Sequence, residues 1–296
     1  MAIFVCNSNI IMRIDKTTDI ALFNQYEWSK KFSSMSQLQK KDLMYRWVKS
    51  DYDRLKETII TYLGSNDLNP QNMDEVYSAF ADFHLRAKGL RYKSFRVEVV
   101  SSPFVQAVEN NLDKLLNCFK EESYYQIFGE CYGCMLIESY LVSYSILEDG
   151  SQIDIIERTN ADGDVVDYFM PKNTLLTYSN EEYKNTNATQ RILTLFFGVL
   201  SYKKYGETET IYIASGVKRE IPDDDGILMN RAPFPITHLD SSWFKTIIRT
   251  EGFKVRGHFR LQPYGEGRKE RKLIYIEDYE KHGYTRTAKK LLSEGE

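Results

Sequence analysis

Residues 132–169 read YGCMLIESYLVSYSILEDGSQIDIIERTNADGDVVDYF, and this stretch decides the fold class. Residues 132–147 are rich in tyrosine and β-branched side chains, which favour strands. Two further strand-like runs, 153–158 and 165–169, flank residues 160–163, whose Asp-Gly pair is a signal for a tight hairpin turn. The stretch therefore predicts a β-rich middle part.

Upstream, residues 36–63 predict a helix that ends near Gly64 and Asn66, because apolar residues recur there at alternating spacings of three and four. The apolar stripe consists of Tyr45, Val48, Tyr52, Leu55, Ile59 and Tyr62. Fewer than three heptads favour packing inside the same domain over a coiled-coil dimer. The stripe is nevertheless wider than one small helical layer easily covers, so we expect a homo-oligomer that buries it.

Two more helices are predicted in this half of the chain. One follows Pro70, carries an apolar face from Met73 to Ala87 and ends at Gly89. A short strand over 94–100 leads to the other helix, which begins at Ser102 because Pro103 suits the first helical position.

Downstream of the β-rich stretch, 192–205 fits either a buried helix or a strand, and we favour the helix. Residues 208–214 predict a strand, and the turn-rich residues 222–235 are the best candidate for a linker. The expected fold class is α+β, with three consecutive regions. These are a mainly helical region over 1–122, a β-rich region over 123–235, and a basic hairpin with a tail over 236–296.

Charge is distributed unevenly along the chain. The formal net charge is −3, yet residues 245–292 contain 13 Lys or Arg against six Asp or Glu. The rest of the chain is acidic, so the basic end is a candidate interaction surface. The 21 tyrosines either line half-buried strands or supply contact area at interfaces.

The basic end predicts a β-hairpin, with strands over 253–261 and 272–277 and a turn over 262–267. The candidate partner-binding residues are Arg256, His258, Arg260, Tyr264, Arg268, Lys269, Arg271 and Lys272. Such a hairpin can follow a phosphate backbone while His258, Tyr264 and Tyr275 stack on bases. It can equally bind an acidic protein surface, or be a solvated face without a partner.

The runs VRGHFR at 255–260 and KLIYIE at 272–277 resemble a C-terminal hairpin that recurs in proteins of phages and mobile elements. More loosely, the chain resembles the phage anti-Gabija proteins. That resemblance implies a non-enzymatic inhibitor that oligomerises around a host nuclease–helicase defence complex and prevents its action on DNA. It also implies the host cytoplasm as the location. The alternative is a phage nucleic-acid-binding protein that uses the basic hairpin directly.

No motif predicts a catalytic site, a metal site or a cofactor. Cys131 and Cys134 form one CxxC pair, but a zinc site needs four ligands and no second pair exists. We therefore interpret both as structural cysteines. The acidic clusters at 162–164 and 223–225 are best explained as turns. A metal-dependent nuclease that uses the acids of 223–225 with a nearby lysine is the least favoured alternative.

No membrane or secretion signal is evident. The N-terminus lacks the basic start and long apolar run of a signal peptide. The longest apolar run, 192–200, is about half the length that a bilayer requires. We therefore expect a cytoplasmic protein without membrane contact.

Overall fold

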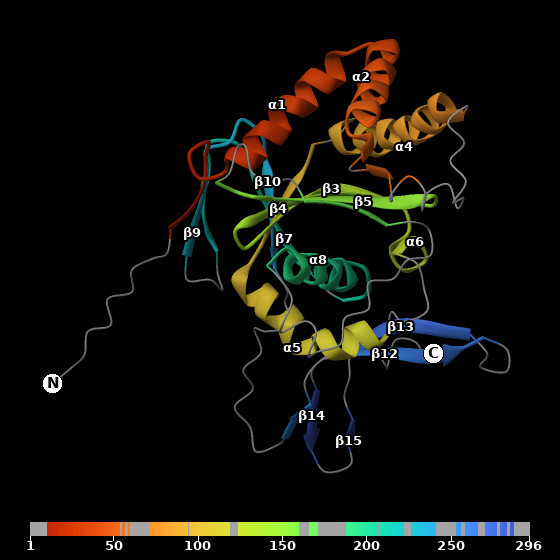
Figure 1. Ribbon diagram of the computed structural model, residues 1–296. Helices are drawn as coiled ribbons and strands as arrows, with labels where there is room; N and C mark the ends of the chain where they lie inside the picture. The colour runs from red at the N-terminus through yellow and green to blue at the C-terminus, as the bar shows by residue number, and fades with distance from the viewer. Residues whose placement is uncertain are drawn as a thin grey trace. The chain divides into compact units, whose positions relative to one another are not determined.

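The computed structural model divides the chain into two compact units built from interleaved segments (Figure 1). Unit 1 comprises 1–15, 98–120 and 177–296, and unit 2 comprises 16–97 and 121–176. The predicted regions 1–122, 123–235 and 236–296 do not coincide with these units. The structure describes residues 11–53, 55–56, 59, 72–93, 95–118, 124–159, 166–170, 188–206, 208–221, 226–240, 253–255, 258–265, 270–276, 279–282 and 285–286.

Helices α1 (Ile20–Ser34), α2 (Gln37–Ser50) and α4 (Met73–Lys93) form the helical part of unit 2. Only Met35 and Ser36 separate α1 from α2. The Ser36 hydroxyl accepts a hydrogen bond from the Gln39 amide, and the Gln39 side chain accepts one from the Ser36 amide. This capping box satisfies backbone donors that a helix start leaves unpaired, and so fixes where α2 begins.

The predicted single helix over 36–63 is wrong in its continuity. Helix α2 ends at Ser50, and Asp51 has the non-helical angles φ −99° and ψ 15°. The Asp51 carbonyl then accepts a hydrogen bond from the Leu55 amide at 2.9 Å, so helical turns resume beyond it. The spacing of apolar residues continues across this break, which is why periodicity alone does not reveal it.

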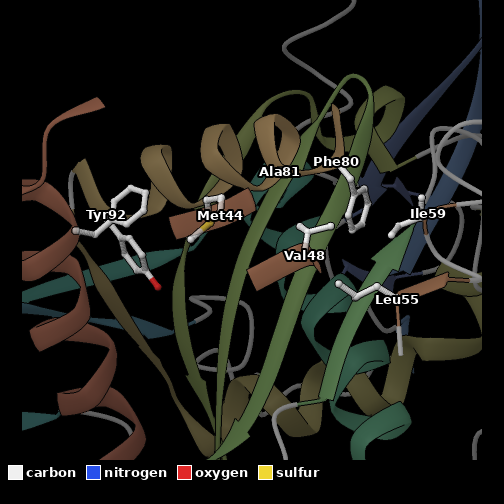
Figure 2. Close-up of a cluster of buried hydrophobic side chains, with 8 residues drawn as sticks. Met44, Val48, Leu55, Ile59, Phe80, Ala81 and Tyr92 are labelled. Carbon is white, nitrogen blue, oxygen red and sulfur yellow. The ribbon is translucent and has the colours of Figure 1, made fainter. Parts of the chain in front are cut away.

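The apolar stripe of this region lies in the core of unit 2. Val48, Leu55 and Ile59 are buried together with Phe80 and other residues of α4 (Figure 2). Tyr45 and Tyr52 are half-buried against the same cluster, and Tyr62 lies outside the described residues. Packing within the domain is therefore the observed arrangement. Homo-oligomerisation stays a prediction, but this stripe no longer argues for it.

Helix α4 continues to Lys93, beyond the end predicted at Gly89. The Gly89 backbone has open space where a Cβ would be, so neither a turn nor a close contact requires glycine there. An isolated glycine inside a helix costs about 1 kcal/mol relative to alanine, which the packing of α4 against α1, α2 and the strands of unit 2 offsets.

The β-rich part of unit 2 is an antiparallel meander. Strands β3 (Cys131–Ile137), β4 (Tyr140–Leu147), β5 (Gly150–Glu157) and β6 (Val166–Met170) lie in the order β6-β5-β4-β3. The hairpin predicted between 153–158 and 165–169 is confirmed as β5 and β6, in which Ile153 pairs with Tyr168. The short helix α6 (Tyr124–Phe128) packs against β4 and β5.

Unit 1 contains the helices α5 (Ser102–Cys118) and α8 (Ala188–Tyr205), both close to their predicted bounds. They pack against each other, and Arg191 of α8 forms an ion pair with Glu109 of α5 at 2.5 Å. Helix α8 is almost fully buried from Ile192 to Tyr202. Together, α5 and α8 form the support for the C-terminal hairpin.

Two groups of strands complete the middle of unit 1. Strands β2 (Val97–Val100), β10 (Ile236–Asp240) and β7 (Glu209–Ile213) are neighbours in that order. A three-stranded sheet pairs β1 (Ile11–Ile14) in parallel with β9 (Gly226–Asn230).

The third strand of that sheet, β8 (Lys218–Ile221), pairs antiparallel with β9. The predicted linker over 222–235 is therefore wrong for 226–230, which form the central strand. Asn230 is fully buried, and its amide nitrogen donates to the carbonyls of Ile213, Ala214 and Phe234. These bonds fix the bends at 232–234, within the longer segment 222–235 whose prolines and polar residues suggested a linker.

The basic end divides into more strands than predicted. Residues 253–261 do not form one strand: β11 (Phe253–Val255) pairs with β14 (Tyr279–His282), which in turn pairs with β15 (Thr285–Arg286). Taken together, the helices and mixed sheets make the protein α+β, as predicted. Among the described residues, no helix is long and apolar enough to cross a membrane.

Candidate functional site: the C-terminal hairpin

The predicted basic hairpin exists as strands β12 (His258–Tyr264) and β13 (Glu270–Ile276). The pairing is antiparallel, with Arg260 opposite Ile274 and Gln262 opposite Lys272. Gly265 follows β12 with φ +77°, a conformation that favours glycine where the chain leaves the strand. Because side chains alternate across a strand, this register determines which residues share each face.

One face of the hairpin is its anchor in unit 1. Phe259, Leu273 and Tyr275 are each less than one-tenth exposed, and they share this face. Strand β12 packs against α5, and β13 packs against α8 (Figure 1). Burial of this apolar face holds the hairpin in place.

Tyr202 of α8 is the centre of the anchor. Its ring centroid lies 4.9 Å from that of Phe259 and 5.1 Å from that of Tyr275, and those two rings are themselves 4.9 Å apart. Phe104 of α5 contacts Tyr202 edge-to-face at 5.5 Å. Tilted and edge-to-face pairs of this kind contribute about 0.5–1.5 kcal/mol each beyond area burial. The hairpin therefore has a defined orientation on its supporting helices.

The opposite face of the hairpin is buried at its Ile276 end, and the rest of it is the exposed basic face, which we define as Arg260, Tyr264 and Lys272 with Gln262 and Ile274 between them. Arg260 and Lys272 are exposed, and Tyr264 is 46% exposed. The register brings the two cations close together, because Lys272 is directly opposite Gln262, two residues from Arg260. The face thus combines a guanidinium, an ammonium and a phenol, which together suit an anionic partner.

The other predicted partner-binding residues are only partly placed. His258 pairs with Ile276 and Arg271 pairs with Pro263 along the backbone, but their side chains lie outside the described part of the structure. Arg256, Arg268 and Lys269 lie outside it altogether. Tyr275 is 3% exposed, so the interpretation that it is available for stacking is wrong.

The two cysteines of the CxxC pair lie within β3 and are not joined to each other in a disulfide. Three residues apart on a strand, they occupy opposite faces. Cys134 is buried, with its sulfur 3.6 Å from the Ser143 hydroxyl, whereas Cys131 is half-buried. The acidic clusters at 162–164 and 223–225 lie outside the described residues. Within the residues that are described, no group of three His, Cys, Asp or Glu side chains could hold a metal ion.

Unit 2 contains a buried polar network that the sequence patterns did not indicate. Arg91 of α4 is 1% exposed and forms a 2.7 Å ion pair with Asp154 of β5. The same nitrogen of Arg91, Nη1, also donates to the carbonyl and the hydroxyl of Ser143. Gln152 donates to Asp154 and contacts Nδ1 of His84 at 3.0 Å. An arginine four residues after Ala87, in line with an apolar helix face, is the signal that could have indicated it.

The electrostatics of this network indicate a structural role. Burial lowers the pKa of His84 to about 3, so the imidazole is neutral near pH 7 and cannot exchange protons there as a general acid or base. Burial is the largest single influence on the pKa of Arg91 and acts to lower it, but the charge and the hydrogen bond of Asp154, together with the nearby Tyr92 and Cys134, outweigh it and the net shift is upward. Arg91 therefore remains a cation neutralised within the core.

Comparison with protein-family models, with curated proteins and with solved structures finds no match to this chain. The case for a function therefore depends on the exposed basic face and on the features of the sequence.

Proposed function

We propose that this chain is a non-catalytic binding protein, a phage-encoded inhibitor that binds a host nuclease–helicase defence complex and blocks its action on DNA. The observation that carries the proposal is the exposed basic face of β12 and β13, held in place by the aromatic anchor around Tyr202. The sequence resemblance to the anti-Gabija proteins makes that class of complex the first partner to test.

The chemistry of the face specifies what it would meet. Arg260 can form two parallel hydrogen bonds to a carboxylate, and Lys272 adds a second positive charge about two residues away. Tyr264 adds exposed aromatic area, the kind of side chain that is enriched at the centres of protein interfaces. We infer an acidic patch with an adjacent apolar surface on the partner protein.

The direct test is co-purification of the tagged full chain with a purified nuclease–helicase complex, together with phage infection of cells that carry the defence system. We expect stoichiometric recovery of the complex by the wild-type chain and loss of binding by at least tenfold in the double variant Arg260→Glu with Lys272→Glu. A matched control, Lys16→Glu with Lys31→Glu, makes the same change in net charge at exposed lysines of unit 2. Equal binding by both double variants, or no binding by the wild type, would refute the proposal.

A second candidate function is binding of single-stranded nucleic acid, which the position of Tyr264 near Lys272, on the face that also carries Arg260, favours. Burial of Tyr275 removes one of the predicted stacking residues and ranks this function second. It predicts affinity that falls with salt, and a log–log slope that becomes shallower by about 1.4 when Arg260 and Lys272 are replaced by alanine, at about 0.7 for each phosphate contact with a single strand. Gel-shift titrations at several salt concentrations measure that slope.

A further inference from the structure

A second surface of unit 1 is the outer face of the three-stranded sheet β1-β9-β8. The registers of the two strand pairs place Ile11, Ile227 and Glu220 side by side in one row across the three strands. The next row on the same face consists of Arg13, Met229 and Lys218. These six residues are contiguous neighbours, and we call them the outer sheet face.

Burial shows that this face is turned away from the core. The opposite side of the sheet carries Ile14, Leu228 and Ile221, which are 0%, 1% and 5% exposed. On the outer sheet face, Ile11 is 48% exposed, Lys218 and Glu220 are exposed, and Ile227 and Met229 are half-buried. An apolar centre therefore lies between charged residues on the surface of the protein.

The two charges of β8 on this face, Lys218 and Glu220, are self-complementary. Consider a second copy packed face to face, related by a two-fold axis that crosses the strands midway between the two rows. The rotation places each row over the other row of the partner, so Lys218 of each copy lies opposite Glu220 of the other copy, twice. It also places Ile227 against Met229 twice. A two-fold interface requires this reciprocity, in which residue i meets residue j and residue j meets residue i.

We propose that the outer sheet face is a homodimer interface, and that the occupant of this face is a second copy of the chain. Two reciprocal Lys218–Glu220 pairs would set the orientation, and the Ile227–Met229 contacts would exclude water between them. The aliphatic part of Arg13 can cover Ile11 of the partner. Six residues form a small interface, so we expect a dissociation constant on the order of 10 µM. The face is built from strands other than the hairpin, and the dimer does not depend on the proposed inhibitor function.

The test is the mass of the full chain by light scattering at about 1 µM and about 100 µM, on either side of the expected dissociation constant. The wild type should change from a mass close to the monomer value of 34.7 kDa at the lower concentration to a mass that approaches twice that value at the higher one. Lys218→Glu alone places a glutamate of one copy opposite a glutamate of the other in both pairs. Glu220→Lys alone places a lysine opposite a lysine in both pairs. Each single variant should weaken the dimer by about tenfold or more.

The double variant Lys218→Glu with Glu220→Lys restores opposite charges in both pairs and should recover the wild-type dissociation constant to within about threefold. All three variants change exposed residues, and circular dichroism checks that each one folds. A wild-type chain that stays monomeric at the higher concentration overturns the proposal. A dimer that neither single reversal weakens, or that the double reversal does not restore, overturns it as well.

Discussion

Two helices of this protein are held to strands by different chemistry. Helix α4 contributes Arg91, whose charge is buried and paired with Asp154. Helix α8 contributes Tyr202, whose ring packs among Phe259 and Tyr275. A buried charge must be paired to be tolerated, so its contact is specific but costly to break. An aromatic cluster loses stability in proportion to the area and contacts removed. The Arg91–Asp154 ion pair lies in the core of unit 2, whereas the aromatic cluster around Tyr202 holds the two strands of the hairpin at the surface of unit 1.

The largest effect is expected from breaking the buried ion pair. Arg91→Met leaves the Asp154 carboxylate buried without its cation, and should lower the free energy of unfolding by about 4 kcal/mol. Denaturant titration, monitored by tryptophan fluorescence, measures this loss. The double variant Arg91→Met with Asp154→Leu removes both charges and should recover most of the stability. A single variant that loses less than about 1 kcal/mol would show that the charge pairing is unimportant.

The aromatic anchor should give the next largest effect. Tyr202→Ala removes a fully buried ring, which should cost about 3 kcal/mol. It should also weaken partner binding, because β12 and β13 lose their support. Tyr202→Phe keeps the ring and is the matched control, with a smaller loss expected. Binding that is unchanged by Tyr202→Ala in a folded protein would show that the hairpin does not need the anchor.

A third effect concerns pH, and it depends on the titration of His84. The pKa of His84 is about 3 in the folded protein and about 6.5 when unfolded, so folding favours the neutral imidazole. Its contribution to stability is complete above pH 6.5 and is lost as pH falls from 6.5 towards 3. Between pH 7 and pH 5 the free energy of unfolding should fall by about 2 kcal/mol more in the wild type than in His84→Gln. Equal pH dependence of the two proteins would contradict this.

The smallest effect is expected from a second ion pair on α4. Arg86 pairs with Asp149, but their side chains are 57% and 34% exposed. Solvent screens such a pair, so Arg86→Ala should cost less than about 1 kcal/mol, and less still at high salt. Comparison with Arg91→Met, on the same helix, isolates burial as the cause of the difference.

Local patterns predicted much of this fold. The meander from β3 to β6 followed from strand-forming residues and turn signals, and α5 and α8 from their apolar faces. Long-range pairing was not predictable. Strand β1 pairs with β9, where Ile11 is opposite Ile227, and no local signal connects segments so far apart in sequence. Asn230 shows the same limit, because a turn-rich segment became an ordered strand through contacts with distant carbonyls.

The position of the candidate site could be predicted from the sequence, but which face of the hairpin is exposed could not. Alternation in 253–261 and 272–277 indicated a hairpin, and β12 and β13 confirm it. Both faces carry aromatic residues, and alternation alone does not specify which face is buried. Tyr275 was therefore assigned to the surface, although the ring of Tyr202 covers it. The stripe around Val48 was expected to pack within its domain and also to contribute to an oligomer; it lies in the core, which agrees with the first expectation.

The central claim is that the exposed basic face of the hairpin contacts a partner protein. The most direct measurement is amine labelling of the full chain with and without the purified nuclease–helicase complex, followed by mass spectrometry. Lys272 lies on the face, and Lys31 is an exposed lysine of unit 2 that serves as the internal control. We predict that the complex reduces labelling of Lys272 by about tenfold or more and leaves Lys31 unchanged. Equal labelling of Lys272 in the presence of a bound complex would contradict the claim.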